Sequence, residues 1–212
     1  MYVPRHFMED RKEILHKLII ENPFGTLVSN GQSGLDANHL PFELEPNTGE
    51  LGTLMAHVSK NNPLLNDITA LDQVLVVFQA GNAYISPTWL PSKKDSERQV
   101  PTWNYLVAHA KGRITFHNDE VHVRKMVARL TKRHEASMDS PWKMSDAPKD
   151  YISELLTHIV SIEIEITSLL GKSKLNQDDG ATDMIGAGSA LIAQGEQKIG
   201  VAMLAAAKNL KD

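Results

Sequence analysis

Cysteine, long apolar runs and an excess of positive charge are all missing from this sequence, and each absence excludes a class of protein. Without cysteine the chain forms no disulfide, thiolate metal site, iron–sulfur cluster or cysteine nucleophile. The longest unbroken apolar run, Val201–Ala207, falls far short of the ~20 residues that span a bilayer. The opening residues Met1–Phe7 have no apolar core after a basic start, so we expect no signal peptide, no membrane contact and a cytoplasmic location.

The balance of charge and size is that of an ordinary globular chain. The 212 residues carry 22 Lys and Arg against 26 Asp and Glu, and this net charge of −4 argues against a protein that works mainly by binding polyanions. Hydrophobic residues make up 42% of the chain, as expected of a chain with a core. No internal repeat or linker is visible, so we expect residues 1–212 to form a single domain.

Short apolar segments separated by turn signals predict a β-rich fold. Val74–Phe78 is a continuous apolar run, typical of a strand buried on both faces, and Ala80–Asn82 then predicts a turn. Isoleucine alternates with polar residues within Val160–Leu170, so one face of that strand is expected to pack in the core and the other to face solvent. Further strands are expected at 26–29, 35–45, 51–58, 83–85 and 105–116, the last with Gly112 as a β-bulge.

Helical spacing is present near both ends and in the middle of the chain. Residues 7–20 place apolar side chains at helical intervals, and Asn22-Pro23 ends that helix. Asp119 is the expected N-cap of a helix with one apolar face. Further helices are expected at 149–157 and from Met184 onward. Six or seven short strands together with these helices predict an α+β fold, a β-barrel with helices packed outside.

Nine histidines raise the question of a metal site. His117 and His122 flank the acidic pair Asp119 and Glu120, but the two histidines are five residues apart, whereas two ligands on one helical face would be four apart. We therefore expect a solvated surface there and no metal site.

The segment 120–135 holds the only concentration of positive charge in this acidic chain. Lys125, Arg129, Lys132 and Arg133 fall at i, i+4, i+7 and i+8, opposite the apolar face. Nucleic-acid binding needs positive groups gathered on one face. A solvated outer face has the same pattern, and we favour it over a DNA-binding surface.

One segment has the residue types of a phosphate site. Ser59, Lys60 and Asn61 follow a strand and combine a hydroxyl, a point charge and an amide just before a helix start at Pro63. A polar turn that caps this helix would explain the same residues equally well.

Two aromatic segments, Tyr84–Trp89 and Val100–Tyr105, flank a long polar loop, Ser86–Pro101. Their aromatic rings and prolines could form a rigid surface that packs against a planar ligand. Alternatively, the same side chains anchor the ends of the loop. A further segment, Gly171–Gln177, follows the strand with the clearest alternation and has no role that its spacing reveals.

Taken in order, these segments resemble the PaiB-like family of FMN-binding negative transcriptional regulators over nearly the whole chain. The paired Tyr-Ile-Ser-Pro-x-Trp and Val-Pro-Thr-Trp-Asn-Tyr motifs are specific. Lys60 stands where the family usually has arginine, and Ser173 stands where it has tryptophan. The other matching residues are Met1–Phe7, Asn38–Phe42, His109, Gly112, Leu130-Thr131, His134-Glu135 and Asp146–Pro148.

The resemblance implies an FMN-binding split β-barrel that forms a homodimer with its flavin sites at the subunit interface. It assigns no catalytic residue. The cofactor-binding residues it implies fall into three groups: Asn38, His39 and Leu40 along the flavin ring; His57, Ser59, Lys60 and Asn61 at the phosphate; and Trp103, Asn104 and Tyr105 closing the site.

Two functions stay open at this point. The first is an FMN-binding transcriptional regulator, for which the charge of the chain gives DNA binding only weak support. The second is a flavin-dependent oxidoreductase in which FMN turns over. Because a flavin brings its own redox chemistry, no acid or base in the sequence separates the two.

Overall fold

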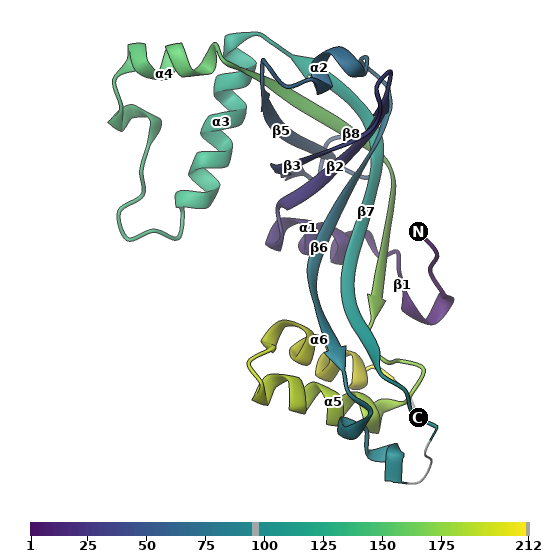
Figure 1. Cartoon of the computed structure of the whole chain (residues 1–212). Coiled ribbons are helices and arrows are strands. Elements are labelled where there is room, and N and C mark those ends of the chain that lie inside the picture. The colour runs from purple at the N-terminus through teal and green to yellow at the C-terminus, as the bar shows by residue number, and fades with distance from the viewer. Residues whose placement is uncertain (95–97, 211–212) are drawn as a thin grey trace. The chain divides into compact units, whose positions relative to one another are not determined.

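A computed structural model describes residues 1–94 and 98–210 of the chain (Figure 1). Its strands form one sheet in the order β3-β2-β6-β7-β8-β5-β4, with β1 paired to β8. The chain divides into two compact units. The barrel unit contains Pro23–Val77 and Ala110–Leu169; the terminal unit contains Met1–Asn22, Phe78–His109 and the chain from Leu170 onward.

Three long strands contribute residues to both units: β6 (Gln73–Ile85), β7 (Thr102–His117) and β8 (Ile159–Lys174). The barrel unit also has β2 (Phe24–Gly31), β3 (Gly34–Pro41), β4 (Glu43–Glu45), β5 (Thr53–Ser59), α2 (Leu64–Asp67), α3 (Glu120–Glu135) and α4 (Lys149–Leu156). The terminal unit also has β1 (Met8–Glu9), α1 (Lys12–Glu21), α5 (Ala181–Ala193) and α6 (Gln197–Ala207).

Phe42 closes the barrel. Strands β3 and β4 stand at opposite ends of the strand order, yet only this residue separates them along the chain. Phe42 is 1% exposed, and its N–H donates to the Pro23 carbonyl oxygen at 2.8 Å. The sheet must therefore curl until its two ends meet, which breaks the single strand expected at 35–45 into two.

The barrel core follows the alternation of β5 and β8. Leu54, Ala56 and Val58 of β5 are buried, as are Ile162 and Ile164 of β8, whereas the residues between them face outward. Helix α3 lies against the outer side of these strands (Figure 1). The prediction of an α+β barrel with helices outside is confirmed.

Strand lengths differ from the sequence prediction. The turn expected at Ala80–Asn82 is wrong, because β6 runs unbroken from Gln73 to Ile85. Ala83 and Ile85 are buried in the core of the terminal unit, and this burial favours continuing the strand. Gly81, with φ +143°, supplies backbone freedom that other residues rarely have.

The apolar run at the start of β6 is buried on one face only. Val74 and Val76 are buried, whereas Leu75 and Val77 are half-exposed. The prediction of burial on both faces is therefore wrong for the single chain, because no described part of its own unit fully covers the outer side.

The terminal unit packs α5 against α6 (Figure 1). A Cβ on Gly200 of α6 would come within 2.8 Å of the Gly188 carbonyl oxygen of α5, so the two backbones approach closely here.

The loop expected at Ser86–Pro101 contains two short 3₁₀ helices, Pro87–Trp89 and Pro91–Lys94, while its residues 95–97 lie outside the described part. Helix α1 begins at Lys12 rather than at residue 7.

Among the described residues, none of the helices combines the length and the apolar character that crossing a membrane requires.

Asp119 caps α3 as the sequence predicts, and its removal should destabilise the helix. Its carboxylate accepts the His122 N–H at 2.8 Å. We expect Asp119→Ala to lower the free energy of unfolding by about 1 kcal/mol, measured by urea denaturation. Asn caps as well as Asp, so Asp119→Asn should stay close to wild type. Equal losses of unfolding free energy in both variants would show that the charge of Asp119 stabilises the helix, and not its capping hydrogen bond.

Candidate functional site

The turn after β5 carries three of the residues assigned to the FMN phosphate, Ser59, Lys60 and Asn61. Its backbone donors are already used. The Lys60 N–H donates to the His158 carbonyl oxygen at 2.8 Å, and the Asn61 N–H donates to Ser59 Oγ at 3.2 Å. The first N–H of α2, that of Leu64, donates to Asn62 Oδ1 at 2.9 Å.

A phosphate at this turn would therefore depend on side chains. Ser59, Lys60 and Asn61 are all exposed. Within the described part of the chain, the Lys60 ammonium has no ion pair. The cation is the strongest phosphate-binding group that the turn offers.

His57 lies on the outward side of β5, beside Met55 in the alternation and opposite the buried core. Burial lowers the pKa of His57 below its usual range, so the imidazole is neutral at pH 7. Its Nδ1 is buried and has no hydrogen-bond partner among the described residues. The ring can therefore still exchange a hydrogen bond with a ligand.

Asn38, His39 and Leu40 lie in β3, the strand that ends at the barrel-closing corner. Asn62 Nδ2 donates to Asn38 Oδ1 at 2.7 Å, which ties β3 to the turn after β5. His39 is exposed, and its ring lies 6.5 Å from that of Phe24 in an edge-to-face arrangement. The structure thus brings the predicted ring-binding strand close to the predicted phosphate turn.

Trp103, Asn104 and Tyr105 lie at the start of β7 in the terminal unit. Trp103 is 55% exposed, and its ring lies 6.0 Å from that of Tyr84. Asn104 points the other way, because it is fully buried and its Nδ2 contacts Met203 Sδ at 3.4 Å. Its Oδ1 has no partner within the described residues.

A cationic and aromatic cluster forms around Lys172 and Lys174, in the segment without an assigned role. The Lys172 ammonium lies 5.3 Å from the centre of the Tyr105 ring and 5.9 Å from those of Tyr2 and Phe7. Lys174 donates to Trp103 O at 2.8 Å, and burial lowers its pKa. The spacing of residues in the sequence did not predict this cluster. It forms because β8 continues as far as Lys174, beyond the end expected for the strand.

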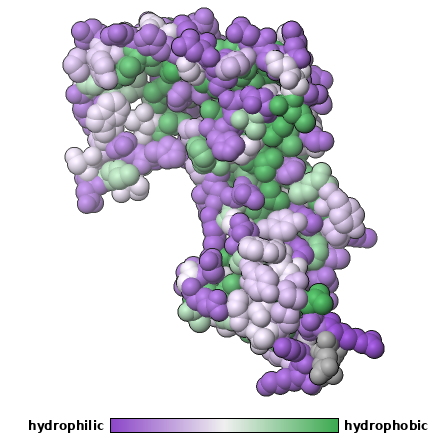
Figure 2. All heavy atoms as spheres, viewed as in Figure 1, coloured by the Kyte–Doolittle hydropathy of each residue, from purple (hydrophilic) through white to green (hydrophobic). Residues whose placement is uncertain are grey.

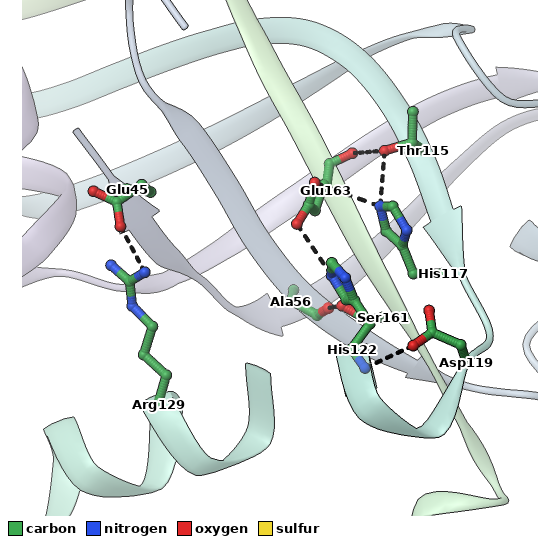
Figure 3. A network of polar contacts seen from close by, with 9 residues as sticks. All are labelled: Glu45, Ala56, Thr115, His117, Asp119, His122, Arg129, Ser161 and Glu163. Carbon is green, nitrogen blue, oxygen red and sulfur yellow. Dashed lines mark hydrogen bonds and ion pairs between the residues drawn. The ribbon is translucent and has the colours of Figure 1, made fainter. Parts of the chain in front are cut away.

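The basic face of helix α3 is largely exposed, and two of its arginines pair with β4. Arg129 Nη1 lies 2.6 Å from Glu45 Oε2 (Figure 3). Arg133 Nη1 lies 2.9 Å from Glu43 Oε2, so both arginines pair with β4. Lys125, Arg129 and Lys132 are exposed, whereas Arg133 is half-buried. The solvated basic face that the sequence predicts is therefore present at the first three of these residues, and Arg133 departs from it because it pairs with the buried Glu43.

Comparisons with known proteins agree with this geometry. A family model described as "Putative FMN-binding domain" matches residues 1–168. An uncharacterised protein of Emericella nidulans is 34% identical over an alignment that covers 88% of each chain. The protease synthase and sporulation protein PAI 2 of Bacillus subtilis is 29% identical, over 86% of this chain and 85% of that one.

Solved flavoprotein structures share the fold. The FAD and heme binding protein of Mycobacterium smegmatis matches with a TM-score of 0.58 at 15% identity, over 81% of this chain and 78% of that one. A flavocytochrome of Azotobacter vinelandii matches with a TM-score of 0.57 at 10% identity, over 84% and 77%. With the barrel, the matched family model and the motifs in agreement, this chain belongs to the PaiB-like FMN-binding split-barrel family, whose cofactor is FMN.

Proposed function

We propose that β3 and the end of β5 bind the FMN of this family. The phosphate contacts Ser59, Lys60 and Asn61, and the flavin ring lies along Asn38, His39 and Leu40. The observation that carries this proposal is the exposed Lys60 ammonium, which has no ion pair among the described residues. The backbone N–H groups of this turn already donate hydrogen bonds within the protein, so the ammonium is its main group for a phosphate.

The residues present fit this cofactor. A phosphate favours charge-assisted hydrogen bonds, and Lys60 can supply one while Ser59 and Asn61 add neutral donors. The neutral His57 ring, with its buried Nδ1 unpaired, offers a further polar contact. The assignment of Trp103, Asn104 and Tyr105 to the flavin rests on the family resemblance.

We also propose a homodimer formed by the outer face of β2, β3 and β6. Strand register places Thr26 opposite His39 and Val77, so these three side chains share that face. Apolar side chains are visible over the strands in Figure 2, whereas hydrophilic residues predominate over α3 and α4. The exposed or half-exposed apolar members of the face are Phe24, Val28, Leu35, Ala37, Leu75 and Val77. Because His39 lies on this face, dimerisation there would put a flavin-binding residue at the subunit interface.

Light scattering tests this assembly. We expect twice the 23.5 kDa chain mass at micromolar concentration, and an isologous two-fold contact. Leu35→Glu should give monomers, because it places a charge on the apolar face that the partner would cover. Val121→Glu is the matched control, since Val121 of α3 is also 79% exposed. A monomeric wild type, or a dimer unchanged by Leu35→Glu, would contradict the proposed interface.

We infer a regulatory role for the flavin protein, as the PaiB-like resemblance implies and as suits a Bacillus subtilis relative named for protease synthesis and sporulation.

A flavin-dependent oxidoreductase is the second candidate. The pairing of Arg129 and Arg133 with β4 favours it, because DNA backbone binding needs available positive groups. When bound, FMN supplies the redox chemistry itself.

Two measurements on the FMN-loaded protein separate these roles. Reduction of the bound flavin by NADH or NADPH, followed by its visible absorption, would support the oxidoreductase. Salt-dependent, sequence-selective DNA binding would support the regulator. If DNA is bound through α3, changing Lys125 and Lys132 to glutamate should abolish it, whereas binding that survives would place the DNA surface elsewhere. A purified protein that takes up no FMN would contradict both roles.

A further inference from the structure

His117, His122 and Glu163 converge on the outer side of the barrel unit from three different elements (Figure 3). His117 ends β7, His122 lies in the first turn of α3, and Glu163 points outward from β8. Glu163 contacts both rings: its Oε2 is 3.4 Å from His117 Nε2 and its Oε1 is 3.1 Å from His122 Nε2. All three side chains are about 30% exposed, with values of 31%, 30% and 29%.

The two imidazole rings are stacked on each other. Their centres lie 4.0 Å apart and their planes differ by 11°, so the rings are stacked and both Nε2 atoms face the same carboxylate. Thr115 Oγ1 lies 3.5 Å from His117 Nε2, and the Asp119 cap fixes the backbone of His122. An imidazole binds a metal ion through a lone pair that lies in the plane of its ring, so one of the two stacked rings must turn about its side-chain torsions before both can bind one ion.

These separations match those between ligands of one metal ion. Nitrogen and oxygen ligands lie about 2.0–2.2 Å from Zn²⁺, so two ligands of a tetrahedral ion are about 3.3–3.6 Å apart. The two histidine-to-glutamate distances, 3.4 and 3.1 Å, are close to that spacing. Asp119 adds negative charge, since one ligand atom from each of His117, Asp119 and His122 lies within 4.8 Å of the others.

Open positions on such an ion would face a cavity. A pocket of about 200 Å³ is lined by His122 and Glu163 together with Met55 and Arg129. Arg129 is paired with Glu45 at 2.6 Å, and Lys125 adds a second positive charge to the lining of the pocket. Water or a small ligand could complete the coordination from this pocket.

We propose that His117, His122 and Glu163 form a binding site for a divalent transition-metal ion of the Zn²⁺ class, with open coordination positions toward the pocket. Two imidazoles and one carboxylate are a set that binds Zn²⁺ and related ions. The spacing of five residues, which excludes two ligands on one helix, is no obstacle because His117 belongs to a strand and His122 to a helix. The site is separate from the residues assigned to FMN and does not depend on them.

Metal binding to the full chain, stripped with a chelator and assayed with and without FMN, tests this site. We expect one Zn²⁺ per chain by equilibrium dialysis, an increase in the melting temperature on adding Zn²⁺, and a visible absorption band with Co²⁺. His122→Ala and Glu163→Gln should each weaken Zn²⁺ binding by more than about 100-fold, beyond the effect of losing a residue that only supports a ligand.

The controls separate a metal site from a structural role. His134→Ala removes an exposed histidine from the same helix and should bind Zn²⁺ as wild type does. Glu163→Gln keeps the shape of the side chain, so its melting temperature without metal should equal that of wild type while the Zn²⁺-induced increase is lost. The proposal is wrong if wild type binds no stoichiometric Zn²⁺, or if His134→Ala reduces binding as much as His122→Ala.

Discussion

Arg133→Ala should destabilise the chain by about 3–5 kcal/mol, because it leaves a buried carboxylate without its cation. Glu43 is 2% exposed, and its Oε2 accepts from Arg133 Nη1 at 2.9 Å. Its Oε1 is buried and has no partner among the described residues, so Arg133 supplies the charge compensation that the structure shows for this group. Urea denaturation followed by circular dichroism measures the change.

Arg129 provides the matched control one turn earlier on the same helix. Its pair with Glu45 is more exposed, at 41% and 27%, so Arg129→Ala should cost less than about 1 kcal/mol. Replacing both Arg133 and Glu43 by methionine should restore most of the stability, because an apolar pair does not leave a charge buried. Similar losses at Arg129 and Arg133 would show that burial does not set the strength of these contacts.

Lys60→Ala should weaken FMN binding by roughly 10- to 100-fold, the effect of losing a charge-assisted contact of about 1.5–3 kcal/mol. The backbone N–H groups of Lys60 and Asn61 are already bonded within the protein, so they cannot replace the lost ammonium. Riboflavin lacks the phosphate and should bind weakly to both proteins with little difference between them. Flavin fluorescence titration gives all four affinities.

Lys60→Arg is the control for charge. The PaiB-like resemblance places arginine here, and its guanidinium keeps the positive charge while offering two parallel donors to a phosphate. This variant should bind FMN at least as tightly as wild type. If Lys60→Ala weakens FMN and riboflavin equally, or leaves FMN unaffected, the phosphate does not lie at this turn.

Local signals predicted several elements correctly. The Asp119 cap, the helix after Pro148 and the alternation of Ile162, Ile164 and Ile166 all agree with the structure. Each depends on neighbours within one or two turns or along one strand, where capping and side-chain period act directly. The flavin residues came from the family resemblance instead, and their contacts with FMN stay predictions.

Non-local packing explains where the sequence prediction failed. The Ala80–Asn82 segment has turn residues, yet β6 continues through it because Ala83 and Ile85 are buried against the helices of the terminal unit. The strand expected at 35–45 breaks at Phe42 because the sheet closes there. In both places burial of apolar side chains outweighs a weak local preference.

The sequence by itself determined the barrel class, the amphipathic pattern of α3 and the family of the chain. Only the tertiary structure decided which charged and polar groups meet: Arg133 with Glu43, and His117 and His122 with Glu163. Hydrophobic alternation is a property of adjacent residues, so it can be read along the chain. Ion pairs and metal sites depend on atoms a few ångströms apart that come from distant segments, and strand order and helix docking set those distances.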